Sequence, residues 1–162
     1  MSLIGKIVIG GAGAALLGAG AYLLRLRRTA SQLETVVKTN VHQINQSGIT
    51  IRVDVLLKNP TRGSLKIKFP FIKLLYLGST IGTSQAIDKD VLIPSYGQAV
   101  VDGIMIQVPA VGLISIGVDL IKGILGATAG VSVQIKTITA IDLWFKTLPY
   151  EKTQDIILKK QG

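Results

Sequence analysis

The chain of 162 residues has no cysteine and a single histidine, His42. The lack of cysteine excludes a disulfide framework, thiol catalysis and cysteine-based zinc sites. His42 stands alone on a predicted strand, without a second histidine for a metal site and without a clear nucleophile and orienting acid for catalysis. We therefore expect no metal centre in this chain and no chemistry built on cysteine or histidine.

Nucleotide-binding loops and clustered carboxylates are lacking as well. The glycine-rich stretch GGAGAA at residues 10–15 lies inside an apolar run, with neither a preceding strand nor a following Lys-Ser pair. The acidic residues are scattered, and the densest group, Asp88 and Asp90 around Lys89, is typical of a solvated turn. The sequence thus predicts no cofactor, no small-molecule substrate and no enzymatic activity.

Acidic and aromatic residues are both scarce. Lys and Arg number 18 against 9 Asp and Glu, which leaves a formal net charge of +9, and aromatic residues make up 5% of the chain. A basic balance favours anionic neighbours such as lipid headgroups, nucleic acid or an acidic partner, although solubility alone also explains it. Base stacking needs aromatic side chains, so any contact with nucleic acid should be non-specific.

What the sequence does contain is one long apolar run. Residues 7–24, IVIGGAGAALLGAGAYLL, carry no ionisable side chain apart from Tyr22. With the apolar residues just before it, the run reaches the length of a helix that crosses a bilayer. We predict a transmembrane anchor over residues 1–28; the alternatives are a cleaved signal peptide and a buried or amphipathic helix. The predicted membrane-spanning residues are Ile7, Val8, Ile9, Leu16, Leu17, Leu23 and Leu24.

Three arginines follow the run directly, at Arg25, Arg27 and Arg28. The positive-inside rule keeps such a cluster on the cytoplasmic side, so we expect the N-terminus outside and the rest of the chain in the cytoplasm or an equivalent interior. The arginines also suit anionic headgroups. Residues 29–34 turn polar and are interpreted as a linker.

Small residues recur at every fourth position along the apolar run, at Gly10, Ala14 and Gly18. Such a line lets two helix backbones approach closely in lipid. It predicts self-association or packing against another membrane helix, unless it only reflects how common Gly and Ala are in membrane helices.

From residue 35 onward, apolar residues recur with a period of two, which is typical of half-buried strands. A turn signal at residues 45–48 separates two such runs. The pair Asn59-Pro60 ends the second run, because proline cannot donate to a strand ladder. Further along, strict alternation predicts that Val101 shares a face with Gly103 and Met105.

The pattern changes once, in residues 111–125, where the apolar spacing is helical. We predict one helix packed on a sheet there; a second membrane span and a peripheral membrane contact are the alternatives. With about seven or eight short strands, the predicted fold class is mainly β. It is an antiparallel β-sandwich over residues 35–162, fibronectin- or immunoglobulin-like, with one late helix.

Basic residues gather in one predicted hairpin, at Lys58, Arg62, Lys66, Lys68 and Lys73. Together with the three arginines after the apolar run, they are predicted to form a basic surface near the membrane. Such a surface would contact anionic headgroups or, non-specifically, nucleic acid. The alternative is a solvated strand face without a partner.

The order of these turn signals resembles the late embryogenesis abundant group 2 family, whose module is the water stress and hypersensitive response (WHy) domain. The resemblance covers roughly residues 35–158 and implies a fibronectin-like β-sandwich with one helix, often behind a membrane helix, in a family that binds or supports rather than catalyses. The strong basic charge and the glycine-rich anchor depart from the family. The matching positions are Asn59-Pro60, Leu77-Gly78, Ile93-Pro94, Gly97 and Val108-Pro109.

The sequence therefore predicts a non-catalytic, single-pass membrane protein whose body lies close to the bilayer. Its expected partners are the lipid bilayer, anionic headgroups and other membrane or coat proteins of an assembly. One alternative is a structural protein of a membrane-containing virus particle, anchored in the internal membrane of the virion. The other is a stress-protective module that binds an apolar ligand between its sheets.

Overall fold

The computed structural model of this chain divides into two compact units, Met1–Gln32 and Leu33–Gly162, and we call the second unit the body. The predicted anchor, its line of small residues, and Arg25 and Arg27 lie outside the residues that the structure describes. Within the described part, no helix is long and apolar enough to cross a membrane. The described residues are 28, 32–116, 118–125, 130–143 and 146–158.

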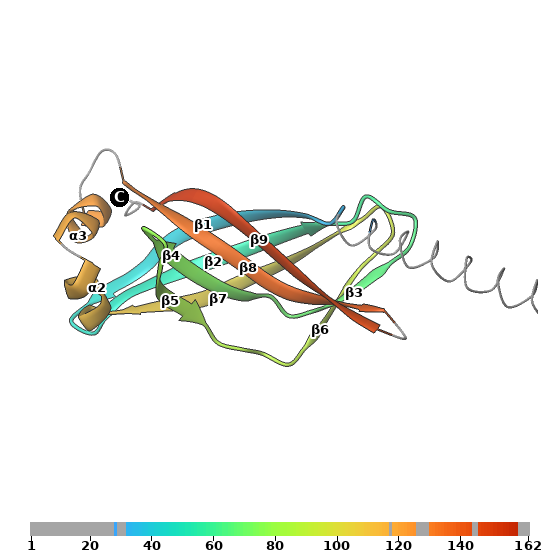
Figure 1. The fold of residues 1–162 in the computed structure, drawn as a ribbon, viewed down its shortest axis with the longest axis horizontal. Helices are drawn as coiled ribbons and strands as arrows, with labels where there is room; N and C mark the ends of the chain where they lie inside the picture. The colour runs from blue at the N-terminus through green and yellow to red at the C-terminus, as the bar shows by residue number, and fades with distance from the viewer. Residues whose placement is uncertain (1–27, 29–31, 117, 126–129, 144–145, 159–162) are drawn as a thin grey trace, which may run out of the picture. The chain divides into compact units, whose positions relative to one another are not determined.

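The prediction of a mainly β chain is confirmed (Figure 1). The helix predicted over residues 111–125 is two helices in the structure, and residue 117 between them is outside the described set. Over the described ranges the elements are β1 Glu34–Asn45, β2 Gly48–Lys58, β3 Leu65–Lys68, β4 Phe71–Tyr76, β5 Ser79–Ser84, β6 Asp90–Ile93, β7 Gln98–Pro109, α2 Ala110–Ile116, α3 Val118–Leu125, β8 Val131–Leu143 and β9 Lys146–Leu158.

Hydrogen bonds join these strands into one antiparallel sheet, in the order β1-β2-β7-β5-β4-β8-β3-β6, with β9 also paired to β8. β3 and β4 both pair with β8. Pro70 lies between these two strands, where a residue without an N–H donor suits a break in the ladder. Because the bonded strands form one sheet, the predicted division into the two sheets of a sandwich is not confirmed.

Side chains of β9 reach β1, which is the far end of the strand order. The Thr35 hydroxyl lies 2.9 Å from the Tyr150 hydroxyl, which donates to the Leu33 carbonyl at 3.0 Å. The Gln154 amide donates to the Thr35 carbonyl. Burial raises the pKa of Tyr150 above its ordinary value, so this hydroxyl stays protonated and able to donate. These bonds occupy carbonyl groups that the edge of β1 would otherwise leave open.

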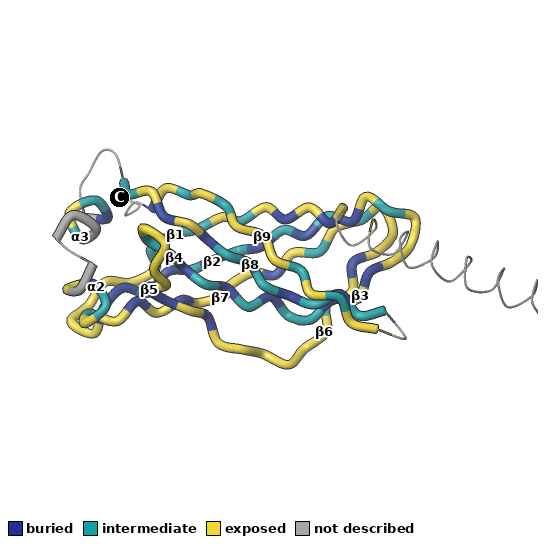
Figure 2. Tube along the Cα trace, in the orientation of Figure 1, coloured by how far each residue is buried: buried dark blue, intermediate teal, exposed yellow. Residues whose placement is uncertain are grey.

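Alternation of apolar and polar residues explains which side of each strand faces the core (Figure 2). β2 buries every second side chain, as its sequence pattern predicts, and β4 and β8 contribute further buried residues. Each fully buried Ile or Leu stabilises the fold by about 1.5–3 kcal/mol. The fully buried core includes Ile51, Val53, Val55, Leu57, Ile72, Leu74, Ile106, Ile135 and Ile141.

The predicted faces of residues 98–109 are wrong for the second half of that strand. Val101 and Ile104 are both buried, whereas Met105 is exposed. The cause is a β-bulge: Val55 pairs with Val101 but Val53 pairs with Ile104, so β7 carries an extra residue there. The bulge shifts the alternation, and the side chains that follow it change faces.

Gly103 makes this bulge possible. Its φ is +69°, a left-handed conformation that glycine adopts readily. The Asp54 carboxylate on β2 accepts a 2.8 Å hydrogen bond from the Gly103 N–H. This backbone hydrogen bond lowers the pKa of Asp54 below its ordinary value. The Asp54 carboxylate on β2 thus stabilises the bulge in β7.

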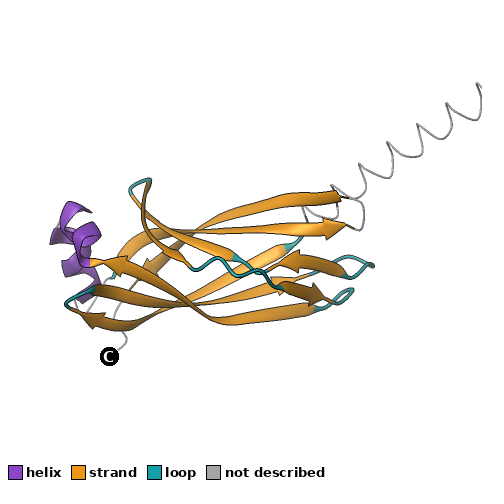
Figure 3. Cartoon of the chain, turned by 90° about the horizontal axis from the view of Figure 1, so that it is seen from below, coloured by secondary structure: helices purple, strands orange, loops and turns teal. Residues whose placement is uncertain are grey.

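Most connections lie at the two ends of the body, whereas the segment between β5 and β6 runs along its side (Figure 1 and Figure 3). We call one the N-terminal end: Glu34 opens β1 there, opposite Lys58, beside the loops at residues 59–64 and 94–97. The other, the helical end, holds the β1–β2 turn, α2, α3 and the β4–β5 turn. β1 has 12 residues, so the two ends lie about 40 Å apart.

Candidate interaction site at the N-terminal end

At the N-terminal end, the side chain of Asn59 makes hydrogen bonds to two loops. Its side chain is only 1% exposed and stands where β2 stops. The amide nitrogen donates to the Gly63 carbonyl at 2.7 Å and to the Pro94 carbonyl at 3.0 Å. The amide oxygen accepts from the Thr61 N–H at 3.0 Å and from the Thr61 hydroxyl at 2.6 Å. We call this set of bonds the Asn59 knot.

Backbone hydrogen bonds complete the knot. The Asn59 N–H donates to the Gly97 carbonyl at 2.9 Å, and the Tyr96 N–H donates to the Thr61 carbonyl at 2.9 Å. A buried polar side chain that satisfies this many groups is costly to replace, because each partner would lose its hydrogen bond. The knot therefore fixes two loops that are far apart in the sequence, and the prediction of a turn at Asn59-Pro60 describes only half of its role.

Two exposed side chains project from the loops that the knot holds. Arg62 is exposed between Thr61 and Gly63. Tyr96 is 69% exposed although its φ is +51°, an unfavourable conformation for a bulky residue. Lys58 lies nearby, half-buried and opposite Glu34 in the β1–β2 pair. The N-terminal end thus presents the guanidinium of Arg62, the aromatic ring of Tyr96 and the ammonium of Lys58, whose cross-strand neighbour is Glu34.

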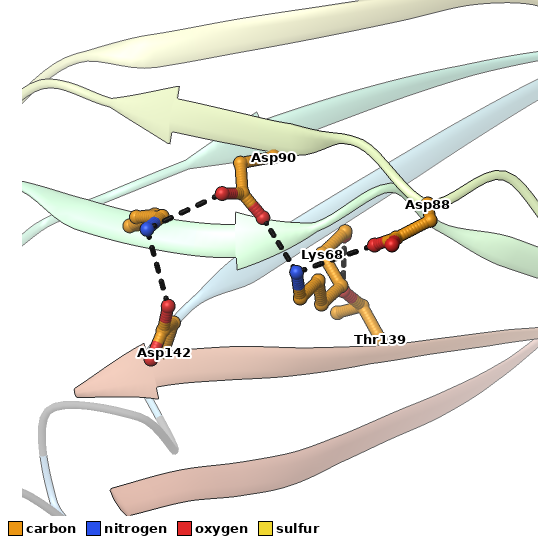
Figure 4. A network of polar contacts seen from close by, with 6 residues as sticks. Lys68, Asp88, Asp90, Thr139 and Asp142 are labelled. Carbon is orange, nitrogen blue, oxygen red and sulfur yellow. Dashed lines mark hydrogen bonds and ion pairs between the residues drawn. The ribbon is translucent and has the colours of Figure 1, made fainter. Parts of the chain in front are cut away.

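The other two predicted contact residues, Lys66 and Lys68, lie in ion pairs (Figure 4). Lys66 is 3.2 Å from both Asp90 and Asp142, and Lys68 is 2.9 Å from Asp90 and 3.4 Å from Asp88. Two lysines on β3 therefore face three carboxylates contributed by β6, β8 and the segment before β6. Carboxylates of the body neutralise the charges of Lys66 and Lys68. The basic surface therefore contains fewer unneutralised lysines than the sequence predicts.

The ion pairs shift the pKa values of Lys66, Lys68 and Asp90. Hydrogen bonding to Asp90 raises the pKa of both Lys66 and Lys68 above its ordinary value. The hydrogen bond from Lys68 lowers the pKa of Asp90 in turn. All these groups stay charged at neutral pH, and exposed pairs of this kind add little stability individually. Their effect is to hold the short strand β6 beside β3 and to cancel charge.

Of the remaining predicted site residues, Arg28 is exposed, and Arg25 and Arg27 lie outside the described residues. His42 is exposed on β1. Tyr96 and Thr61 were not predicted as site residues. The turn signal Asn59-Pro60 pointed to the loop of Thr61, and the pattern Ile93-Pro94 before Gly97 pointed to the loop of Tyr96.

Comparisons with known proteins find structural neighbours at low sequence identity. No family model matches the chain, and no curated protein does. A crystal structure from Archaeoglobus fulgidus shares 12% identity over 80% of this chain and 100% of its own, with a TM-score of 0.48. A solution structure from Arabidopsis thaliana shares 18% identity over 81% of this chain and 84% of its own, with a TM-score of 0.50. A solution structure described as a late embryogenesis abundant protein shares 16% identity over 96% and 89%, with a TM-score of 0.46.

Among these neighbours, the solution structure from Arabidopsis thaliana, with a TM-score of 0.50, supports a shared fold at low identity. At 18% identity a structural likeness shows the fold alone, because one fold serves many functions. The proposed function therefore rests on the residues of this chain.

Proposed function

We propose that this chain is a non-catalytic interaction module held beside a membrane, with the N-terminal end of its body facing anionic lipid headgroups. We further propose that the body is a fibronectin-like β-sandwich of the late embryogenesis abundant group 2 type, and that it follows a single transmembrane helix. The carrying observation is the uncharged run at residues 7–24, which is followed at once by three arginines.

The short connection between the proposed anchor and the body supports a headgroup contact at the N-terminal end. If residues 7–24 span a bilayer, the connection over residues 25–33 extends at most about 30 Å. The loops that carry Arg62 and Tyr96 lie at the end of the body where β1 starts. These loops are therefore within reach of the headgroup region that the arginines would occupy.

The chemistry of these loops suits a headgroup layer. Arginine binds phosphate through paired N–H donors, and tyrosine is enriched where a bilayer meets water. The ion pairs of Lys66 and Lys68 leave Lys58 and Arg62 as the members of the predicted basic group that we assign to this contact. In this proposal Glu34 moderates Lys58, and Arg62 contributes most.

The apolar-ligand alternative receives less support from the structure. Among the described residues, the inward side chains of β2, β4 and β8 are almost completely buried. A ligand between the strands would have to displace this packing. We therefore favour a surface role, with lipid or an assembly of membrane proteins as the partner.

Binding of the body, residues 33–162, to vesicles of phosphatidylcholine and phosphatidylserine tests the headgroup contact. A Lys58→Gln, Arg62→Gln variant should bind roughly ten- to thirtyfold more weakly at low salt, because a basic residue near an anionic surface adds about 1 kcal/mol and the share of Lys58 is reduced by Glu34. The matched control, Lys73→Gln with Lys152→Gln, removes the same charge outside the two loops and should bind much more tightly than this variant. Equal losses in the two variants would show that only net charge matters and would reject this surface.

A further inference from the structure

The outward faces of the neighbouring strands β1, β2 and β7 carry an uninterrupted row of apolar side chains (Figure 1). Val36 pairs with Leu56, and Leu56 pairs with Val100, so the three residues lie side by side across the sheet. Val36 is 40% exposed, Val100 is 62% exposed and Leu56 is half-buried. We call these residues the apolar row. Single exposed valines are usual on strands, but directly paired neighbours about 5 Å apart form a continuous apolar surface.

A charged row lies on each side of the apolar row. Towards the N-terminal end Glu34 pairs with Lys58, and towards the helical end Lys38 pairs with Asp54. Each charged row is two positions away from the apolar row along β1 and β2, which corresponds to about 7 Å. The order along β1 is therefore acidic, apolar, basic, and at the matching positions of β2 it is basic, apolar, acidic.

This order of charges is complementary to itself. A second copy can be rotated by half a turn about an axis parallel to the apolar row, so that its face lies on the face of the first copy. Glu34 then meets Lys38 of the second copy, Lys58 meets Asp54 of the second copy, and the apolar row meets itself. A twofold axis makes each of these contacts twice. Aligned sheets cross at about 30°, and rows this close to the axis stay opposite one another.

The net charge of this face also favours a second copy over an anionic partner. The whole chain has a formal net charge of +9, so a net repulsion acts between two copies. The outward face of the described residues of β1, β2 and β7 carries three cations and three carboxylates, and is neutral. Within one copy Arg52 is 3.2 Å from Asp54 and 3.9 Å from Asp102. The six charged residues are Glu34, Lys38, Arg52, Asp54, Lys58 and Asp102.

We propose that this face joins two copies of the chain in a twofold dimer, with the apolar row at its centre. The three strands are about 14 Å wide and the two charged rows are about 14 Å apart, so the contact is smaller than the roughly 800 Å² per partner of a stable complex. The dimer should therefore be weak, with a Kd of about 0.1 mM. Its face includes Lys58 but not Arg62, and it requires no lipid.

The absence of cysteine allows a position-specific cross-linking test on the full chain in neutral detergent. Val36→Cys places a single thiol in the apolar row, opposite the same thiol of a second copy. Ile157→Cys, at an exposed position on β9 outside this face, is the control. At about 0.1 mM protein, a short bifunctional maleimide should link the Val36→Cys chain about tenfold faster than the control, because the dimer raises the effective thiol concentration. Equal rates for the two thiols overturn the proposal.

A charge in the apolar row should break the dimer. Val100→Lys, combined with Val36→Cys, places a lysine ammonium opposite itself across the axis and should lower the cross-linking rate to that of the Ile157→Cys control. Ile114→Lys adds the same charge at an exposed apolar position of α2, at the helical end, and should leave the rate of the Val36→Cys chain unchanged. A rate that Val100→Lys does not lower overturns the proposal, because association would then use another surface.

Exchange of two charges tests the twofold geometry itself. Lys38→Glu should lower the cross-linking rate of the Val36→Cys chain several-fold, because carboxylates of the two copies would face each other. Adding Glu34→Lys restores both the complementary order and the original net charge, and should recover most of the rate. Recovery supports the proposed axis, because an effect of overall stability would grow with the second substitution. If the rate stays low while circular dichroism shows the double variant folded, the twofold arrangement is overturned.

Discussion

Replacement of Asn59 by Asp should lower the free energy of unfolding of the body by about 3–5 kcal/mol. The amide nitrogen of Asn59 donates to the carbonyl oxygens of Gly63 and Pro94. A carboxylate would direct a negative oxygen at both acceptors in a side chain that is almost fully buried. The loss should be visible as a lower midpoint in urea unfolding of residues 33–162.

The sign of the pH dependence strengthens this test. Burial beside carbonyl oxygens would raise the folded pKa of the new carboxyl above its unfolded value of about 3.9. The penalty should therefore be small below that pH and grow as pH rises towards the folded pKa. Thr61→Val removes one hydroxyl partner only and should cost about 1 kcal/mol. If Asn59→Asp unfolds with the midpoint of Thr61→Val, the Asn59 knot is not the central support of this end.

Gly48→Ala should cost about 4 kcal/mol, for a different reason. Gly48 begins β2 with φ of +137°. A Cβ at this position would be 2.0 Å from the Val108 carbonyl oxygen and 3.0 Å from the Ala110 nitrogen. Both are backbone atoms, so relief would require the β1–β2 turn to move away from the junction of β7 and α2.

Gly63→Ala is the matched control for this substitution. Gly63 lies in an exposed loop, and a Cβ there would meet nothing within 4 Å. Its replacement should change the free energy of unfolding by no more than about 0.5 kcal/mol. Thermal unfolding of both variants measures the difference. Similar Tm values for the two alanine variants would contradict the close approach at Gly48.

The sequence predicted what depends on local pattern. The alternation in β2 identified its buried face, and the signal at residues 45–48 identified the turn before it. Both follow from residues that are adjacent in the chain. The single helix predicted for residues 111–125 had the right type but is two elements in the structure.

What the sequence did not predict depends on residues that are distant in the chain. The β7 bulge is stabilised by Asp54, which comes from another strand. Lys66 finds Asp142 only because β3 pairs with β8, and no local pattern contains that pairing. The basic hairpin was therefore predicted with more exposed charge than the folded body retains.

Flotation of the full chain with vesicles tests the central claim, membrane attachment, most directly. The full chain should float with phosphatidylcholine and phosphatidylserine vesicles at low and at high salt, because an apolar span does not depend on charge. The body, residues 33–162, should float less as salt rises. A full chain that stays in the soluble fraction under both conditions would contradict the proposed anchor at residues 7–24.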